Sequence, residues 1–204
     1  MNGFSVDSKG ERREMVAKII NEVEPRHSGG ASSERYFFNG KVYKVPASKE
    51  SLFKPEEVEK NAEILSKSSV DFVDTILGVY DLSELGYASR TPVVIQEQAE
   101  MTFRESLSNG KATKKTWKLF ERALDVADRA IESEIVLDGS LTNYGLFGNQ
   151  VLFLDVQDGN SVEKYTVEKF EDMYESLANS MSRAGADKAE VRDKMDAKSR
   201  FYTP

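Results

Sequence analysis

The sequence has no cysteine, a single histidine and no apolar run near the ~20 residues that a membrane-spanning helix needs. Without cysteine, disulfides, thiolate catalysis and zinc–thiolate sites are excluded. With only His27, multi-histidine metal sites and serine–histidine–aspartate catalysis are disfavoured. The first residues, Met1 to Asp7, also lack the charged and apolar regions of a signal peptide. We therefore expect a cytoplasmic protein without a membrane partner.

An excess of basic residues is missing as well. Lys and Arg number 28 against 35 Asp and Glu, which gives a formal net charge of −7. Nucleic-acid binding depends on a basic surface that contacts phosphates, so we expect no nucleic-acid partner. The chain does contain 204 residues that are 39% hydrophobic and 31% charged. This composition suits one compact domain or two small lobes with an apolar core.

Hydrophobic periodicity and turn residues divide the first half of the chain into elements. A helix is expected over 8–24, where Ser8 and Glu11 fit a capping box. The dipeptide Asn39-Gly40 favours a two-residue hairpin turn. The remaining pattern predicts strands over 35–38 and 41–45, a helix over 55–67 and a buried strand over 93–95, with residues 68–87 open to helix or strand.

The second half has the strongest helix signal, over 113–132, where apolar residues recur three and four apart and Thr113 is the expected N-cap. The pattern then predicts a strand over 135–137, hairpin strands over 144–146 and 151–154, a helix over 167–182 and a final helix that begins with a capping box at Asp187 and Glu190. Together the two halves predict an α+β fold.

Two polar residues stand where an apolar core favours none. Asp138 follows Ile-Val-Leu and Asp155 follows Val-Leu-Phe-Leu, with Asn143 between them. A carboxylate that ends a buried strand is costly unless it is paired or binds a cation. In phosphoryl transfer one Asp orients the accepting hydroxyl, while an Asn and a second Asp hold Mg²⁺. Asp138 and Asn143 have the D-x-x-x-x-N spacing of kinase catalytic loops, and the interval to Asp155 (155 − 143 = 12) leaves room for a hairpin.

In this respect the sequence resembles the protein-kinase-like superfamily, over about residues 28 to 158. Lys44 ends a strand similar to the one that carries the ATP-phosphate lysine, and Glu63 follows in a helix where its partner is expected. Residues 93–99 are similar to the hinge, which implies that Gln96 is the gatekeeper and that the backbones of Glu97 and Ala99 face adenine.

The resemblance implies a two-lobed protein-kinase-like fold. We expect an N-terminal helical extension (1–27), an N-lobe with an antiparallel sheet and a helix (28–99), and a reduced, mainly helical C-lobe (100–204). It further implies an ATP- and Mg²⁺-dependent phosphotransferase whose acceptor is a protein hydroxyl, the chain itself or a small molecule. The implied site consists of Gly29, Gly30 and Lys44 at the phosphates, Glu63 beside the lysine, Asp138 as base, and Asn143 and Asp155 as metal ligands.

The chain also departs from the kinase pattern. Val136-Leu137 replaces the His-Arg that usually precedes the catalytic Asp, Asp155 is followed by Val-Gln in place of Phe-Gly, and no Ala-Pro-Glu follows. These departures keep two alternatives open: a pseudokinase-like nucleotide- or partner-binding module, and an unrelated α+β binding protein with an accidental match. Residues 28–44 also resemble abbreviated kinase-like proteins of phage genomes, which would place the protein in a host cytoplasm.

Overall fold

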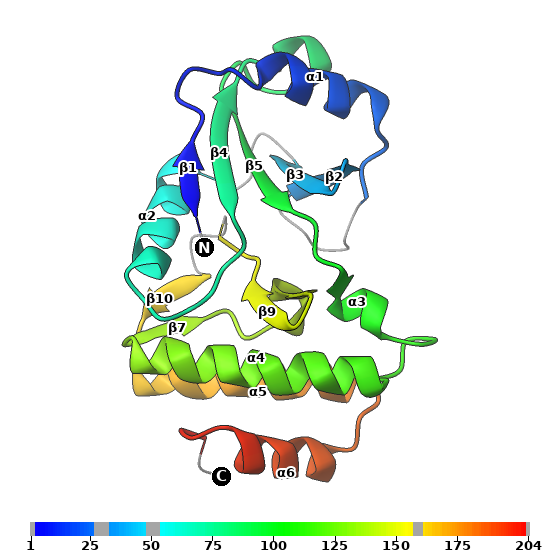
Figure 1. Ribbon diagram of the computed structural model, residues 1–204, viewed down its shortest axis with the longest axis vertical. Coiled ribbons are helices and arrows are strands. Elements are labelled where there is room, and N and C mark those ends of the chain that lie inside the picture. The colour runs from blue at the N-terminus through cyan, green and yellow to red at the C-terminus, as the bar shows by residue number, and fades with distance from the viewer. Residues whose placement is uncertain (1–2, 27–32, 48–53, 157–160, 203–204) are drawn as a thin grey trace. The chain divides into compact units, whose positions relative to one another are not determined.

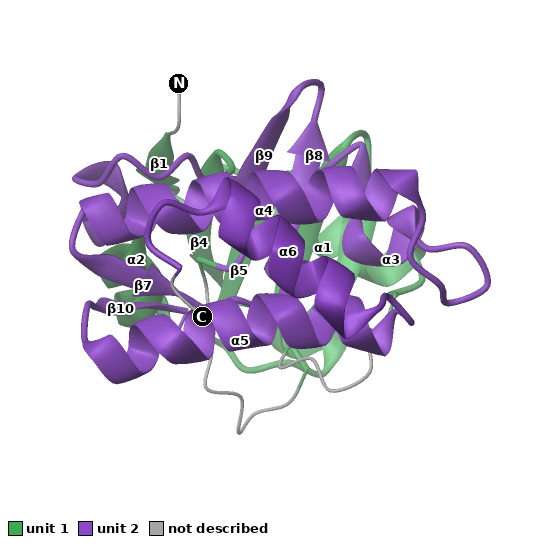
Figure 2. Cartoon of the chain, turned by 90° about the horizontal axis from the view of Figure 1, so that it is seen from below, with its two compact units in different colours: residues 1–63, 73–98, 156–159 green, residues 64–72, 99–155, 160–204 purple. Residues whose placement is uncertain are grey.

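The computed structural model describes residues 3–26, 33–47, 54–156 and 161–202. The chain forms two compact units, which we describe separately (Figure 2). Unit 1 comprises Met1–Glu63, Val73–Gln98 and Val156–Gly159, and unit 2 comprises Ile64–Phe72, Ala99–Asp155 and Asn160–Pro204. Among the helices of the described residues, none combines the length and the apolar character that a membrane span requires.

Unit 1 is built on a five-stranded sheet with the order β1-β4-β5-β3-β2 (Figure 1). Its strands are β1 (Phe4–Val6), β2 (Ser33–Phe38), β3 (Lys41–Pro46), β4 (Thr75–Tyr80) and β5 (Thr91–Glu97). The described neighbours are antiparallel except β1 and β4, which pair in parallel. The sequence predicts an antiparallel sheet and does not predict β1, because a three-residue strand is too short for a periodic signal. The predicted hairpin at Asn39-Gly40 is confirmed, since both residues have positive φ (47° and 69°).

The helices of unit 1 are α1 (Arg13–Glu22) and most of α2 (Pro55–Ser66), with a short 3₁₀ turn, η1 (Ser83–Leu85). The α1 helix buries Val16, Ile19 and Ile20 in an apolar core that it shares with the sheet. The residues that the sheet contributes to this core include Tyr36, Tyr43, Val45, Tyr80, Val93 and Ile95.

The turn before α1 is organised by Asp7, so the predicted capping box at Ser8 and Glu11 is wrong. The Asp7 carboxylate accepts hydrogen bonds from the N–H groups of Glu11 (3.1 Å) and Arg12 (3.0 Å) and from the Tyr80 hydroxyl (2.9 Å). Burial alone raises the pKa of Asp7, but these hydrogen bonds outweigh it and hold the pKa below the ordinary 3.8. The helix therefore begins at Arg13, after an Asp-organised turn.

Unit 2 is mainly helical. Its helices are α3 (Phe103–Ser106), α4 (Lys114–Glu132), α5 (Val167–Arg183) and α6 (Lys188–Lys198), of which α4, α5 and α6 pack against one another (Figures 1 and 2). Two small sheets, β10-β7 and β6-β8-β9, are formed by β6 (Met101–Thr102), β7 (Ile135–Leu137), β8 (Tyr144–Phe147), β9 (Gln150–Phe153) and β10 (Val162–Lys164). The three long helices, β7 and the β8–β9 hairpin confirm the prediction, whereas β6, α3 and β10 are too short to be predicted from periodicity.

A buried carboxylate on α4 anchors the C-terminal segment of unit 2. Asp128 is 3% exposed and accepts hydrogen bonds from the hydroxyls of Tyr174 (2.5 Å) and Ser199 (2.6 Å) and from the Arg200 N–H group (2.8 Å). Burial, and then the hydrogen bond to Asp128, raises the pKa of Tyr174. The α6 helix is also tied to α4 by ion pairs that join Lys194 to Glu121 and Lys198 to Asp125.

Candidate functional site

In unit 1 the predicted phosphate-binding lysine is buried within the sheet. Lys44 is 5% exposed and lies in β3, opposite Val94 of β5 and Arg35 of β2. Its strand neighbours Tyr43 and Val45 belong to the core with α1, so Lys44 projects from the other face of the sheet. A solvated surface lysine is the ordinary expectation for a hairpin strand, whereas a buried ammonium group needs a polar or charged partner.

The α2 helix buries one stripe that includes a polar residue. Val58, Asn61, Ala62 and Leu65 are at most 1% exposed, whereas the predicted partner of the lysine, Glu63, is exposed. Asn61 donates a hydrogen bond of 3.1 Å from Nδ2 to the carbonyl of Val156, the residue that follows Asp155 in the chain. Sequence reasoning missed Asn61, although an amide three residues after Val58 on an apolar stripe is a usable signal.

The predicted hinge residues lie at and beyond the end of β5. Gln96, the predicted gatekeeper, is 3% exposed, and its Nε2 donates to the Thr75 hydroxyl at 3.0 Å. Glu97 forms an exposed ion pair with Lys41 (2.9 Å). Ala99 is 8% exposed, and no hydrogen bond between described residues uses its N–H or C=O group. The role of the Ala99 backbone toward adenine stays a prediction.

In unit 2 Asp138 directly follows β7 and carries an exposed carboxylate. The Asp138 N–H donates to the Ser161 carbonyl (2.9 Å), and its Oδ1 accepts from the Ser140 N–H (2.9 Å). One carboxylate oxygen thus fixes the local turn, while the group as a whole remains accessible. This is a suitable arrangement for a side chain that must orient or accept a proton from an incoming hydroxyl.

The loop that carries Asp138 is held against α5. A Cβ atom on Gly139 would lie 2.0 Å from the Met173 carbonyl oxygen, so only glycine fits this close approach. The N–H of Leu141 donates to the Ser180 hydroxyl (3.2 Å), and that of Leu137 to the Met173 sulfur (3.4 Å). Sequence reasoning missed Met173 and Ser180, because their link to the loop depends on tertiary packing.

The predicted metal ligands are joined by the backbone. Asn143 ends the 3₁₀ turn η2 (Leu141–Asn143), and its carbonyl accepts a 2.8 Å hydrogen bond from the N–H of Leu154, next to Asp155. Beneath them Tyr144 packs edge-on against Phe153 with ring centroids 5.6 Å apart.

The Tyr144 hydroxyl is buried without a hydrogen-bond partner among the described residues. Burial, and then the Asp138 charge, raises the pKa of Tyr144. Asn143 and Asp155 are both partly exposed and offer amide and carboxylate oxygens, which are ligands suited to Mg²⁺.

Within the described ranges no group of three His, Cys, Asp or Glu side chains gathers as a metal site. The predicted pair would not form such a group, since it contains one Asp and one Asn and relies on phosphate oxygens for its other ligands. Gly29 and Gly30, the predicted phosphate-loop glycines, lie outside the described residues.

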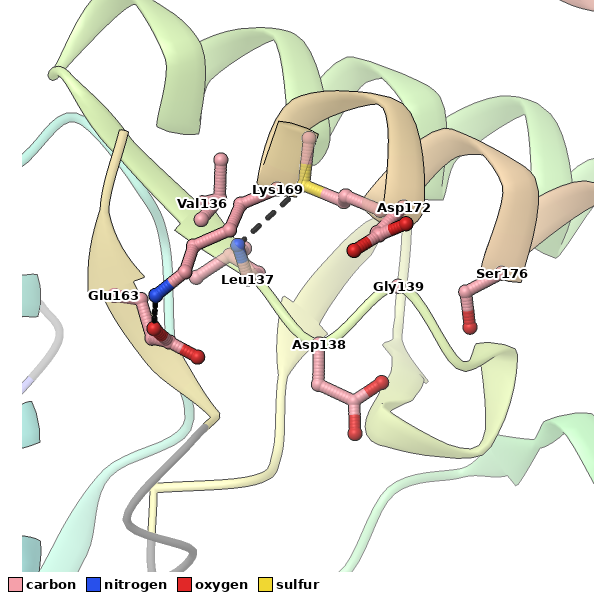
Figure 3. Close-up of a pocket in the computed structure, with 9 residues that line it drawn as sticks. Val136, Leu137, Asp138, Gly139, Glu163, Lys169, Asp172 and Ser176 are labelled. Atoms are coloured by element: carbon pink, nitrogen blue, oxygen red, sulfur yellow. Dashed lines mark hydrogen bonds and ion pairs between the residues drawn. The ribbon is translucent and has the colours of Figure 1, made fainter. Parts of the chain in front are cut away.

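A pocket of about 250 Å³ lies beside Asp138 in unit 2 (Figure 3). Its lining comes from the end of β7, the loop that carries Asp138, β10 and α5, and consists of Val136, Leu137, Asp138, Gly139, Glu163, Lys169, Asp172, Met173 and Ser176. The ammonium group of Lys169 is paired with the Glu163 carboxylate. The pocket therefore combines an apolar wall with several charged groups.

No protein-family model and no curated protein matches the sequence. Solved structures do match. A crystal structure of WbdD, described elsewhere as a bifunctional kinase-methyltransferase, aligns with 88% of this chain and 46% of its own at a TM-score of 0.51 and 9% identity. A co-crystal structure of WbdD with the kinase inhibitor LY294002 aligns over the same shares of the two chains, with a TM-score of 0.51 and 10% sequence identity. A divergent Toxoplasma kinase that lacks the glycine-rich loop aligns with 90% of this chain and 74% of its own. The TM-score is 0.51 and the sequence identity is 11%.

At these identities the likeness shows the fold. The chain has the protein-kinase-like fold, and the predicted α+β class is confirmed, with a mixed N-terminal sheet and a helical C-terminal part. The chain spans less than half of the WbdD chain that it matches. The predicted domain boundaries, the roles of the site residues and the phage-type resemblance stay predictions.

Proposed function

We propose that the chain is an ATP- and Mg²⁺-dependent phosphotransferase. The observation that supports this best is the 2.8 Å hydrogen bond from the Leu154 N–H to the Asn143 carbonyl. This hydrogen bond joins the end of the D-x-x-x-x-N loop to the residue before Asp155. The side chains of Asn143 and Asp155, which both carry oxygen atoms, therefore lie next to the same backbone hydrogen bond. The pair continues the register of the β8–β9 hairpin, in which Tyr144 lies opposite Phe153, so the hairpin brings the two side chains to the same end of its strands.

In this proposal the residues divide the work as the kinase reaction requires. Asn143 and Asp155 hold Mg²⁺, which bridges and neutralises the phosphates of ATP. Lys44 binds the α- and β-phosphates with Glu63 as its partner, and Asp138 orients the acceptor hydroxyl and takes its proton. The backbone of Ala99 binds adenine.

A pseudokinase-like nucleotide-binding module is the second candidate. It is favoured by the Val136-Leu137 pair that stands before Asp138 and by the Val-Gln that follows Asp155 in place of Phe-Gly. The sequence has only Gly29 and Gly30 where kinases carry the full G-x-G-x-x-G loop. This departure does not separate the two candidates, since one solved structure with a similar fold is described as a kinase that lacks the glycine-rich loop.

Transfer from ATP labelled on the γ-phosphate separates the two candidates. We expect labelled product from wild type with Mg²⁺, and none from Asp138→Asn, which should still bind Mg·ATP. Asp193→Asn, an exposed carboxylate on α6, serves as the matched control and should behave as wild type. Normal Mg·ATP binding without transfer to water, to the chain or to any acceptor offered would reject transfer activity and leave the binding module.

A further inference from the structure

We infer that Tyr144 is a positioning residue for phosphate transfer, whose hydroxyl donates a hydrogen bond to the Asp138 carboxylate. The inference rests on the proposed function, because it assigns Tyr144 to the Asp138 of that reaction. It is carried by the burial of the Tyr144 side chain and by its place in unit 2, at the start of β8 and directly after the loop that carries Asp138.

The Tyr144 hydroxyl differs from the other buried polar groups of unit 2. Tyr144 is 0% exposed, and no described residue forms a hydrogen bond with its hydroxyl. Tyr174, which is 1% exposed, shows the ordinary arrangement, since its hydroxyl donates to Asp128 (2.5 Å) and contacts the Ser199 hydroxyl (3.0 Å). Burial of a hydroxyl without a hydrogen bond costs free energy, and phenylalanine would fill the Tyr144 position without that cost. The hydroxyl therefore needs an explanation other than packing.

The surroundings of the hydroxyl include the Asp138 charge. Burial, and then the Asp138 charge, raises the pKa of Tyr144, and Tyr174 contributes less. The hydroxyl thus keeps its proton at neutral pH and can donate a hydrogen bond. The ring that carries it is held by the edge-on contact with Phe153, whose centroid lies 5.6 Å away. A fixed, protonated donor therefore lies within electrostatic reach of the proposed base.

The Asp138 carboxylate has room for a second donor. The Ser140 N–H donates to Oδ1 (2.9 Å), and among the described residues no hydrogen bond is made to Oδ2. A carboxylate that takes a proton from an acceptor hydroxyl must be held in one orientation. Hydrogen bonds of such groups are often long in a free protein and shorten in the reacting complex, or pass through one bridging water. A donation from Tyr144 completes the support that Ser140 begins.

Tyr144→Phe and Tyr174→Phe form a matched pair on the full chain, because each removes only a hydroxyl from a buried tyrosine of unit 2. Tyr144→Phe should leave the urea unfolding midpoint unchanged or raise it, since no described hydrogen bond is lost. Its kcat for transfer of labelled γ-phosphate to the chain or to water should fall about tenfold, with KM for ATP unchanged. Tyr174→Phe should do the reverse and lower the midpoint without changing kcat, because Asp128 and Ser199 lose a partner.

A spectroscopic measurement detects the hydrogen bond independently of activity. In ¹³C NMR of the chain labelled at its Asp carboxyl carbons, the Asp138 signal is identified by its loss in Asp138→Asn. This signal should shift in Tyr144→Phe and keep its position in Tyr174→Phe. The shift should be present in the free protein and larger with Mg²⁺ and the ATP analogue AMP-PNP. A role of Tyr144 confined to packing would not move the signal, since the phenylalanine ring keeps the contact with Phe153.

The outcomes separate the inference from the proposed function. Wild-type transfer, with kcat and the Asp138 signal unchanged in Tyr144→Phe, would overturn the inference and leave the phosphotransferase intact, since the hydroxyl would then bind only a structural water. A fall in both midpoint and kcat with the Asp138 signal unmoved would also overturn it, because it would show a merely structural role. A wild-type protein without transfer, in which Tyr144→Phe still shifts the Asp138 signal, would reject the phosphotransferase and retain the hydrogen bond.

Discussion

Replacement of Gly139 by alanine tests how the loop that carries Asp138 is held in place. A Cβ atom at this position would meet the Met173 carbonyl oxygen at 2.0 Å, whereas ordinary van der Waals contact begins at 3.4 Å. The loop and α5 must therefore separate by about 1.4 Å (3.4 − 2.0) before the methyl group fits. The obstacle is backbone in the middle of a helix, so no side-chain rotation can relieve it.

Separation on this scale has consequences for stability and for chemistry. The hydrogen bond from the Leu141 N–H to the Ser180 hydroxyl is 3.2 Å long, and after this separation the two atoms would be too far apart to form it. We expect Gly139→Ala to lower the free energy of unfolding by about 3 kcal/mol, the upper part of the range for overpacking. A displacement of about 1 Å at Asp138 should reduce phosphate transfer on the order of a hundredfold.

The only tryptophan, Trp117, lies in α4 of the same unit and reports urea unfolding by its fluorescence. Gly3→Ala is the matched control, because its Cβ would lie 3.5 Å from the nearest atom, an ordinary contact. A Gly139→Ala protein with the wild-type unfolding midpoint and wild-type transfer would refute the close packing of the loop on α5.

Three further predictions concern the polar anchors of the two units. Asp128→Ala removes the acceptor of the hydrogen bonds that hold Ser199 and should lower the free energy of unfolding by about 3 kcal/mol in the same fluorescence assay; an unchanged midpoint would contradict the anchor. The lowered pKa of Asp7 means that its contribution to stability is present above pH ~4 and is lost as the pH falls through the lower folded-state pKa. Thermal melts of Asp7→Asn should therefore converge with wild type in acid, and a constant difference down to pH ~2 would contradict this. Lys194→Gln breaks a partly exposed pair with Glu121 and should lower the urea unfolding midpoint only slightly, a loss that about 1 M NaCl removes; a loss independent of salt would argue against an ion pair.

Most regular elements could be predicted from the sequence because their signals are local. The α4 helix shows apolar residues at spacings of three and four with Thr113 as N-cap, and the structure has that cap, with hydrogen bonds from Lys115 and Thr116. Asn39-Gly40 likewise encodes its own turn. By contrast, β1 depends on its parallel pairing with β4, some 70 residues away, and three residues carry no periodicity that could reveal it.

From the sequence, the candidate site could be predicted only as a set of residue types that occur in a given order along the chain. Asp138 and Asp155 stand out because each follows an apolar strand, and Asn143 because of its D-x-x-x-x-N spacing from Asp138. The supports that the structure adds could not be predicted. Ser180 binds the loop from α5, and Asn61 binds the Val156 carbonyl from α2, contacts that depend on packing between distant segments.

The central claim is that Asn143 and Asp155 hold Mg²⁺ against the phosphates of ATP. Isothermal titration calorimetry of ATP, with Mg²⁺ and with EDTA, tests this most directly on wild type, Asp155→Asn and the control Asp193→Asn. The account predicts Mg²⁺-dependent binding that Asp155→Asn loses and Asp193→Asn retains, while Asp138→Asn still binds. ATP binding that is equally tight in EDTA and in Asp155→Asn, or no ATP binding by the wild-type protein, would contradict it.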